Sequence, residues 1–366
     1  MFVLTEDQAV FKDVVGRFFS DKSPVSAVRQ LMESQDGFDR DMWLVMSESL
    51  GLPGLHIPEQ YGGYGFGMVE LGLVLEAMGR HVYCGPYFGS SLMSGFMLTM
   101  SADESAKQRL LPQLASGEKI FSLVLDDLDD YSSWGKSLKV SEDKLTGAAS
   151  IVLDAGIADR LLVVAAEGEN LGLYEVDQSE GVSIRQREVI DPTRKIYSVE
   201  FANAHVNQIG VITQQQARDL WNTWSLCLAH EMLGGAQHLL DSTVEYTKLR
   251  YQFGRAIGSF QSLKHRCADL LMELELAKGV VSDATQSAVS DNAELYLPSM
   301  AKAMASDAYM SIAKSAIQLR GGIGFTWEND THLWFKRAKS SEVFLGTASA
   351  HRENVIALIE ESGYAA

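Results

Sequence analysis

Cysteine, proline and basic residues are scarce in this chain of 366 residues. The three cysteines, Cys84, Cys227 and Cys267, are far apart, form no CxxC pair and leave one thiol over. This spacing argues against a disulfide framework and fits a reducing cytoplasm, with each thiol packed in the interior. Only seven prolines are present, and the sequence contains no internal repeat and no low-complexity tract. A fibrous or disordered architecture is therefore excluded.

Acidic residues outnumber basic ones by 48 to 31, which gives a formal net charge of −17 and a pI near 4.9. A surface of this sign repels nucleic acid and anionic membranes, so we expect neither as a partner. No run approaches the roughly 18 apolar residues of a membrane span. Glu6 and Asp7 stand where a signal peptide would carry basic residues. We therefore expect no export, no membrane span and a cytoplasmic location.

The remaining composition, 46% apolar and 22% charged, is typical of a globular chain long enough for two or three domains. Residues 5–8 read Thr-Glu-Asp-Gln, a capping box, and apolar residues follow it at helical spacing. Helical patterns recur at 41–50, which Gly51 closes, and at 70–80. Residues 1–118 are predicted to form an all-helical domain.

From Ile120 the pattern changes to short runs rich in β-branched and aromatic residues. The runs are IFSLVL, SIVL, RLLVVAA, LGLYEV, VSIRQREV and KIYSVEF. They predict a small β-barrel or sandwich over residues 119–211. Helical periodicity then returns in a long helix with Trp221 and Trp224 on one face, and residues 212–366 are predicted to form a helical bundle. The expected fold class is mainly α with a β middle domain.

The 23 residues between Glu245 and Asp269 contain no carboxylate. They carry five bases: Lys248, Arg250, Arg255, Lys264 and Arg266. Because Phe253-Gly254 joins two predicted helices here, the cations lie at helix ends. Helix ends and arginines commonly hold a phosphate or pyrophosphate. The alternative is that these bases only pair with acids elsewhere on an acidic protein.

A second motif, Gln318-Leu-Arg-Gly321-Gly322-Ile-Gly324-Phe-Thr-Trp-Glu328, directly follows a helical run. Its glycines end the helix and let the backbone approach a flat or charged group, although an ordinary helix cap and turn explains them as well. Glu328 lies in sequence among Phe325, Trp327, Trp334 and Phe335. Such a setting can desolvate a carboxylate and make it a stronger general base, whereas a solvated loop acid is the alternative.

Other catalytic motifs are missing from the sequence. The eight histidines show no HExxH-type spacing, and neither GxSxG nor GxxxxGK[ST] occurs. No GxGxxG joins a predicted strand to a helix, so a nicotinamide site has little support. We expect no metal site, no serine nucleophile and no phosphoryl transfer.

Together the two motifs resemble those of the acyl-CoA dehydrogenases, flavoenzymes with this domain order. Arg250-x-x-Phe253-Gly254, followed by Gln261 and Lys264, is similar to the family's RxxFG segment. The glycine motif, continued by Arg337-Ala338-Lys339 and Gly346-Thr347, is similar to its C-terminal signature, and PEQYGG at 58–63 to its helical domain. The resemblance covers essentially the whole chain. It implies an N-terminal helical domain, a small β-barrel or sandwich and a C-terminal four-helix bundle.

The resemblance implies α,β-desaturation of an acyl-CoA thioester, in which a carboxylate removes the α-proton and a hydride leaves the β-carbon for N5 of FAD. By position Glu328 is the base. Some members carry the base on the long bundle helix, at a place that here is Trp224, which cannot serve. The residues that resemble FAD-binding residues of the family are Arg250, Phe253, Gly254, Gln261, Gln318, Gly321, Gly322 and Thr347.

The middle domain departs from the family pattern. Members carry TEPxxGSD and NGxKxWITN segments that hold the isoalloxazine ring of the flavin. Here those places read LDDLDDYSSWGK (125–136) and TGAASIVLDAG (146–156), with Ile151 in place of the tryptophan and Ala149 in place of the lysine. The aspartates at 126, 127, 129 and 130 would also repel a flavin phosphate or a CoA tail. The C-terminal motifs, whose family counterparts reach a neighbouring subunit's FAD, are intact.

Three functions are compatible with these features. The chain is an FAD-containing acyl-CoA dehydrogenase acting by itself as a homo-oligomer, or the partner subunit that completes a second chain's FAD site in an α2β2 heterotetramer. The third function is a non-catalytic protein that binds acyl-CoA on this scaffold. The resemblance to bacterial heteromeric enzymes implies a steroid side chain or another bulky acyl group as substrate. It also implies an electron-transfer flavoprotein as acceptor, and an oxidase is compatible as well.

Overall fold

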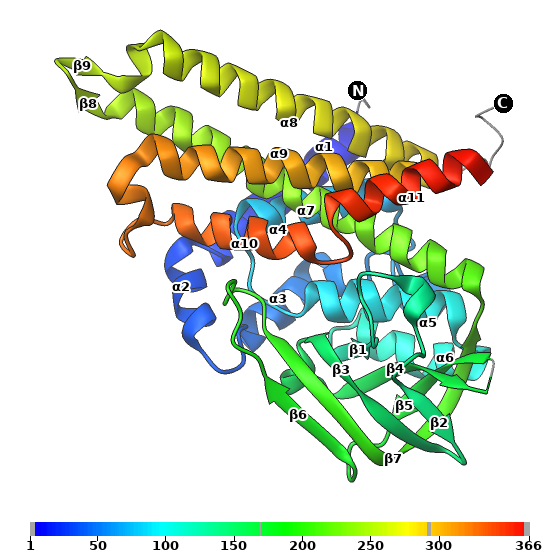
Figure 1. Cartoon of the computed structure of the whole chain (residues 1–366). Coiled ribbons are helices and arrows are strands. Elements are labelled where there is room, and N and C mark those ends of the chain that lie inside the picture. The colour runs from blue at the N-terminus through cyan, green and yellow to red at the C-terminus, as the bar shows by residue number, and fades with distance from the viewer. Residues whose placement is uncertain (1–3, 169, 291–293, 362–366) are drawn as a thin grey trace. The chain divides into compact units, whose positions relative to one another are not determined.

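The computed structural model describes residues 4–168, 170–290 and 294–361 (Figure 1). The chain divides into two compact units. The bundle unit contains residues 1–28, 68–83 and 225–366, and the barrel unit contains residues 29–67 and 84–224. Helices α2 (Val25–Glu33) and α7 (Gln214–Leu249) contribute residues to both units.

Helices make up most of the bundle unit. They are α1 (Glu6–Lys22), α4 (Met68–Arg80), the second part of α7, α8 (Gln261–Ala288), α9 (Leu297–Arg320), α10 (Thr331–Val343) and α11 (Ala348–Glu361). The predicted capping box forms at the start of α1, where Thr5 Oγ1 accepts from the Gln8 amide at 3.2 Å. Helix α9 packs against α8, α10 and α11, and the buried alanines along it allow a close approach.

The barrel unit combines short helices with seven strands. Its helices are α3 (Arg40–Leu50), α5 (Gly95–Ser101) and α6 (Glu104–Ala115). Its strands are β1 (Phe121–Val124), β2 (Lys139–Ser141), β3 (Lys144–Leu153), β4 (Arg160–Glu167), β5 (Asn170–Val176), β6 (Val182–Gln186) and β7 (Ile196–Ile212). Helix α3 ends as the sequence predicts, because Gly51 adopts the left-handed conformation with φ 61°.

Five of the strands close into a ring. Strand β4 pairs with β2 and β5, β5 pairs with β7, β7 pairs with β3, and β3 pairs with β2. Strands β1 and β6 extend the sheet by pairing with β4 and β7. Side chains such as Leu138, Val163, Tyr174 and Val199 are buried together in its core. The predicted fold class, helices around a β middle region, is confirmed.

The prediction missed strand β2, residues 144–149 of β3 and the second half of β7. Strand β7 is 17 residues long because it changes partner, from β3 along its first half to β5 along its second. A strand continued by a new partner carries no break in its own sequence. The boundaries at residues 118 and 211 stay a prediction. Within the described ranges, no helix has the length and apolarity that crossing a membrane requires.

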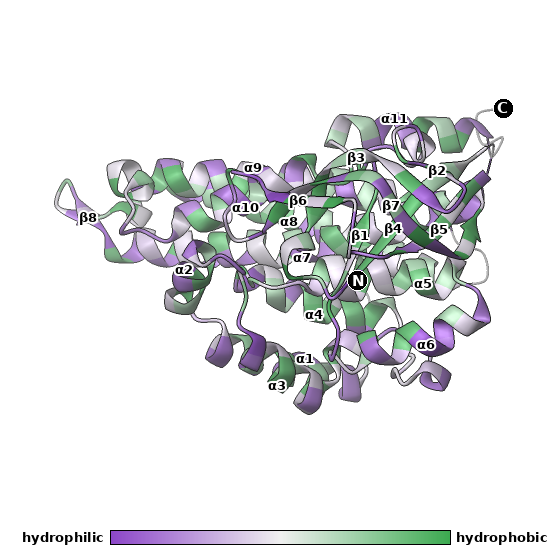
Figure 2. Cartoon of the chain, turned by 90° about the horizontal axis from the view of Figure 1, so that it is seen from below, coloured by the Kyte–Doolittle hydropathy of each residue, from purple (hydrophilic) through white to green (hydrophobic). Residues whose placement is uncertain are grey.

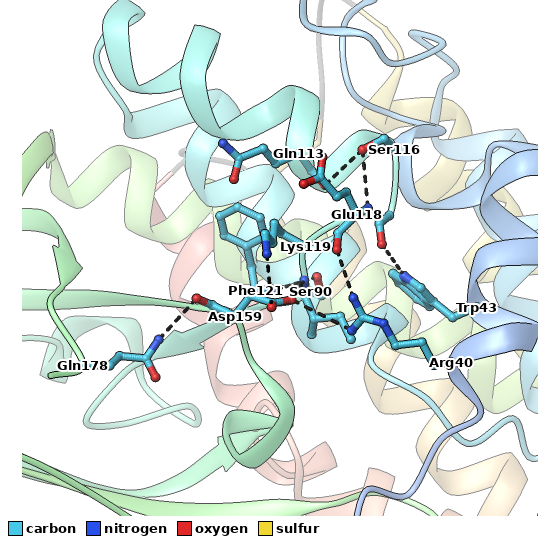
Figure 3. Close-up of polar contacts among 12 residues, drawn as sticks. Arg40, Trp43, Ser90, Gln113, Ser116, Glu118, Lys119, Phe121, Asp159 and Gln178 are labelled. Atoms are coloured by element: carbon cyan, nitrogen blue, oxygen red, sulfur yellow. Dashed lines mark hydrogen bonds and ion pairs between the residues drawn. The ribbon is translucent and has the colours of Figure 1, made fainter.

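Within the barrel unit, polar contacts of Asp159 and of Arg40 on α3 stabilise the segment that leads into strand β1 (Figure 3). Its carboxylate accepts from the Ile120 amide at 2.9 Å and lies 3.5 Å from the Lys119 ammonium. Arg40 of α3 donates to the Glu118 carbonyl at 3.1 Å. These contacts fix where β1 begins, and therefore where the loop after β1 leaves the sheet.

Candidate functional site

A short β-hairpin with a two-residue turn projects from the bundle unit at the end of α7 (Figure 1). Strands β8 (Tyr251–Gln252) and β9 (Arg255–Ala256) pair, so Phe253 and Gly254 form the turn. Both turn residues have positive φ, 54° and 78°, which is the signature of a type I′ turn. A phenylalanine is strained there, since Asn, Asp or Gly is the usual occupant. Its ring is nevertheless 89% exposed.

The cations of the acid-free window divide into two groups. Lys248 pairs with Glu245 at 2.6 Å, and Arg266 donates to the Ser315 hydroxyl at 2.7 Å. Arg250, Arg255 and Lys264, by contrast, form no ion pair with any residue that the structure describes, and all three are exposed.

The two aromatic rings of the hairpin region lie beside these cations. Arg255 stacks over the Phe260 ring at 3.9 Å, and the Phe253 and Phe260 ring centroids are 6.2 Å apart. Figure 2 shows hydrophobic and hydrophilic residues side by side on the hairpin. Intramolecular pairing therefore accounts for two of the five bases and leaves three available to another molecule.

The glycine motif forms the turn after α9. Gly321 ends the helix with φ 63°, and a side chain at Gly321 or Gly322 would meet nothing within 4 Å. Gly324 is different, because a Cβ there would lie 2.9 Å from the Ile317 carbonyl oxygen. Gly321 is thus required by backbone conformation and Gly324 by packing, whereas Gly322 leaves open space above the backbone.

Arg320 attaches this turn to the end of α7. Its buried guanidinium donates to Thr243 at 2.7 Å and to Ser242 at 3.1 Å, and the Tyr246 hydroxyl donates to the Arg320 carbonyl at 3.5 Å. Burial lowers the pKa of Arg320. The hairpin and the glycine turn consequently lie at the same end of the bundle unit (Figure 1).

We call these residues the cationic surface. It consists of Arg250, Phe253, Gly254, Arg255, Gln261, Lys264, Gln318, Gly321 and Gly322, all of them exposed. Seven of them are the predicted FAD-binding residues other than Thr347. Arg255 and Lys264 were outside that set, although the missing acids around them were a usable signal.

Thr347 lies apart from the cationic surface. Its hydroxyl accepts from the Ala350 amide at 3.3 Å, so it caps the start of α11. The 13 residues of α10, about 20 Å of helix, lie between the glycine turn and the segment that contains Thr347. The structure does not bring this predicted residue together with the others.

Glu328 is exposed in the described chain, and the predicted apolar enclosure does not form around it. Phe325 and Trp327 are 76% and 53% exposed, and the Trp327 ring stacks on His332 at 5.0 Å. Aromatic neighbours in sequence therefore did not become a desolvating pocket. Phe325 and Trp327 stay at the surface of the turn after Gly324, whereas Trp334, on α10, is buried.

Other residues of the C-terminal signature hold the fold together. Arg337 is almost fully buried and pairs with Glu231 of α7 at 2.7 Å, while a second nitrogen donates to the Tyr83 carbonyl at 3.1 Å. The buried Lys302 ammonium donates to the carbonyls of Ser341 and Gly346 at 3.0 and 2.9 Å. Spacing alone did not separate these structural residues from the exposed ones.

In the barrel unit, residues 125–137, which we call the closed loop, connect β1 to β2. Asp126 accepts from the amides of Gly135 and Ser137 at 3.1 and 2.6 Å. Asp127 accepts from the amides of Asp129 and Asp130 at 2.8 and 3.3 Å. The aspartates that were predicted to repel a flavin phosphate or a CoA tail thus accept hydrogen bonds from the loop's own backbone and stabilise its fold.

Hydrogen bonds from neighbouring hydroxyls and the Lys136 charge also act on the loop's last aspartate. Burial works against ionisation of Asp130, yet bonds from Ser132 and Ser133 together with the charge of Lys136 hold the pKa of Asp130 below its usual value. The carboxylate therefore contributes to the loop in its charged form.

These observations test whether the chain fits FAD. The cationic surface offers three uncompensated cations and an exposed aromatic ring, which suit the diphosphate and the adenosine of the cofactor. The segments that resemble the ring-binding ones do not suit a flavin ring. The amides of Gly135 and Ser137 in the closed loop are already bonded, Trp134 fills the loop at 4% exposure, and Ile151 lies 45% exposed at a bulge of β3.

Two family models match the chain. The model described as acyl-CoA dehydrogenase, N-terminal domain, matches residues 5–118, and the one described as acyl-CoA dehydrogenase, C-terminal domain, matches residues 222–359. Acyl-CoA dehydrogenase IpdE2 of Mycolicibacterium smegmatis is 32% identical over 343 residues, which cover 94% of this chain and 96% of that protein.

Two solved structures share the fold. The ChsE4–ChsE5 complex of Mycobacterium tuberculosis has a chain with a TM-score of 0.89 at 24% identity, covering 99% of each chain. A variant described as the Tcur3481–Tcur3483 steroid acyl-CoA dehydrogenase has a TM-score of 0.87 at 24% identity, covering 98% of this chain and 99% of that one. From the family models and the similarity to IpdE2 we conclude that this chain belongs to the acyl-CoA dehydrogenases, a family of FAD-dependent oxidoreductases.

Proposed function

We propose that this chain is a subunit of a heteromeric acyl-CoA dehydrogenase. In this proposal its cationic surface completes the FAD site of a second, homologous chain, and the assembly is an α2β2 heterotetramer. The observation that carries the proposal is the contrast between three cations without an ion pair on the cationic surface and the closed loop, in which amides at Asp129, Asp130, Gly135 and Ser137 are bonded to the loop's own aspartates.

Charge explains why this contrast favours a second chain. Arg250, Arg255 and Lys264 remain unpaired on a protein with a net charge of −17, where acids to pair with are abundant. A diphosphate gives such cations charge-assisted hydrogen bonds, which are stronger than bonds between neutral groups. Phe253 holds a strained conformation without intramolecular cover, as residues of functional sites often do. The ring of the flavin then requires a cradle from elsewhere, since the closed loop offers none.

The proposed reaction of the assembly is α,β-desaturation of an acyl-CoA thioester. The thioester makes the α-proton acidic enough for a carboxylate base, and bound FAD accepts the hydride that leaves the β-carbon. The part of this chain is to bind and orient the nucleotide end of the cofactor through Arg250, Arg255 and Lys264.

Similar proteins support the rest of the assignment. Two solved structures with this fold carry names that join two proteins, and one is described as a steroid enzyme. We therefore propose a bulky, steroid-like acyl group as substrate and an electron-transfer flavoprotein as the electron acceptor.

Flavin content tests the proposal. The chain is purified alone and, through an affinity tag, with its native partner, and the ratio of flavin to protein absorbance is measured for both. We expect no flavin on the lone chain and about one FAD per pair of chains in the assembly. A lone chain that binds one FAD per subunit and oxidises acyl-CoA would contradict the proposal.

Arg250→Ala and Lys248→Ala form a matched pair of variants of the assembly. Loss of a hydrogen bond to a charged group costs about 1.5–3 kcal/mol, so Arg250→Ala should weaken FAD binding roughly ten- to a hundredfold. Lys248 is two residues away but already pairs with Glu245, and its removal should change FAD binding less than about twofold. Equal effects of the two variants would show that general surface charge, and not the unpaired cation, holds the cofactor.

The position of Glu328 in the C-terminal motif, which resembles that of the family's base, gives a second candidate function, in which this chain supplies the catalytic base. Anaerobic bleaching of the flavin by acyl-CoA distinguishes the two candidates. Loss of a general base slows the reaction by about 10²–10⁴-fold, so Glu328→Gln should show this loss if Glu328 is the base. If the chain only completes the cofactor site, the rate should match that of Glu353→Gln, an exposed acid of α11.

A further inference from the structure

The closed loop is attached to α7 by two tryptophans, within the barrel unit. The Trp134 indole nitrogen donates to the Asp127 carbonyl at 2.8 Å, inside the loop. The Trp221 indole nitrogen, on α7, donates to the Leu128 carbonyl at 3.1 Å. One bond therefore closes the loop on itself and the other fixes it to the helix.

Four aromatic rings pack between the loop and the helix. The Trp134 and Trp224 centroids are 5.8 Å apart with an interplanar angle of 32°, and the Tyr131 and Trp221 centroids are also 5.8 Å apart. Trp134, Trp221 and Trp224 are 4%, 3% and 0% exposed. Aromatic pairs at such distances contribute beyond the apolar area they bury, so the rings hold the loop against α7.

Backbone amides of the closed loop that could donate hydrogen bonds to a planar heterocycle already donate to carboxylates of the loop. Four backbone amides of the loop region donate to Asp126 and Asp127, and a fifth, that of Ser132, donates to Asp130 at 2.9 Å. A flavin presents carbonyl oxygens and ring nitrogens that accept hydrogen bonds. Its entry would require these five bonds to break and would place the ring's acceptors beside carboxylates, which repel them.

From this packing we infer that the closed loop and the α7 tryptophans form an aromatic plug that takes the place of a flavin ring in the barrel unit. The plug consists of Tyr131, Trp134, Trp221 and Trp224. The barrel unit completes its fold with its own side chains, and it excludes flavin. The plug is a property of this chain by itself and holds whether or not the cationic surface completes a neighbour's site.

Thermal unfolding of the full chain tests the plug. Added riboflavin, which carries the flavin ring without the diphosphate and adenosine that suit the cationic surface, should leave the Tm unchanged, because no ring site exists to be filled. Trp134→Gly opens a cavity of indole size, and the Tm should fall by about 5–10 °C. Added indole should restore much of this loss in the variant and none in the wild-type chain, since only the variant has room for it.

Two variants control for removal of a tryptophan in general. Trp327→Gly removes a ring that is 53% exposed, so it should lose little stability and gain nothing from indole. Trp224→Phe keeps a ring in the plug and removes an indole nitrogen that has no partner in the described structure, so the Tm should stay the same or rise.

If Trp134→Gly does not fold, Asp126→Asn replaces it, with hydrogen exchange of the Gly135 and Ser137 amides as the measurement. We expect exchange at least tenfold faster in this variant, with the rest of the barrel unchanged. The plug is overturned if riboflavin raises the Tm of the wild-type chain, or if Trp134→Gly leaves the Tm where it was. Neither outcome affects the test with Arg250→Ala, because that test measures the flavin bound by the assembly and not by the chain alone.

Discussion

The polar groups of the cationic surface and those of the closed loop differ in whether they are paired within the chain. On the cationic surface, three cations form no ion pair within the described chain, and a strained aromatic ring is exposed. In the closed loop, carboxylates and indoles of the chain bond to its own backbone and fill its own interior. Exposed cations that form no ion pair are available to an anionic group of another molecule, whereas the loop's bonded amides are not. The contrast therefore supports the proposal that this chain binds the nucleotide end of a cofactor shared with a second chain.

The largest expected effect comes from comparing substitutions of a buried and an exposed residue of the C-terminal signature. Arg337→Met breaks a buried ion pair with Glu231 by removing one partner, and such a change costs about 3–5 kcal/mol of unfolding free energy. Urea unfolding should show this loss in the isolated chain. Lys339→Met breaks only an exposed pair with Glu342 and should cost less than about 1 kcal/mol. Equal losses would mean that burial does not divide the signature into structural and binding residues.

A smaller effect, of opposite sign for stability and binding, is expected at the hairpin tip. Phe253→Asn places a residue that favours positive φ in the type I′ turn, which should stabilise the isolated chain by about 1 kcal/mol. The same change removes the exposed ring, so the assembly should retain less FAD. Phe325→Asn is the matched control, because Phe325 is 76% exposed but is not among the residues with positive φ. A gain in stability without any loss of FAD would show that Phe253 is not part of the cofactor site.

The sequence predicted the fold well where local signals are strong. The capping box at Thr5 and the helix end at Gly51 are set by neighbouring residues, and both form. At Phe253-Gly254 the sequence predicted only a junction of two helices, and the structure has a short hairpin there. The second half of β7 was missed because its pairing with β5 is a long-range event that leaves no local break.

For the candidate site, the sequence indicated the cations without ion pairs and missed the exposure of Glu328. The acid-free window marked the unpaired cations, since a lack of acids nearby is visible in the sequence. The exposure of Glu328 and the capping role of Thr347 depend on where the turn after α9 and the helix α10 direct the chain. The bonds between the aspartates of the closed loop and its backbone were likewise invisible, and the same residues were interpreted as repulsive charge.

The smallest expected effect is the pH dependence of the stability that Asp130 of the closed loop contributes. Because the folded-state pKa of Asp130 lies below its usual value, its charged form stabilises the folded chain. This contribution is fully present above the pKa of the unfolded carboxyl, about 3.9, and is lost as the pH falls through the lower folded-state pKa. Since Asp130 is exposed, the difference in unfolding free energy between wild type and Asp130→Asn should be only a few tenths of a kcal/mol. Urea unfolding at several pH values should show that difference constant from about pH 5 to 8 and shrinking below about pH 4. A difference that persists to pH 2 would assign the loop's stability to its packing alone, and would leave the aspartates as surface charge.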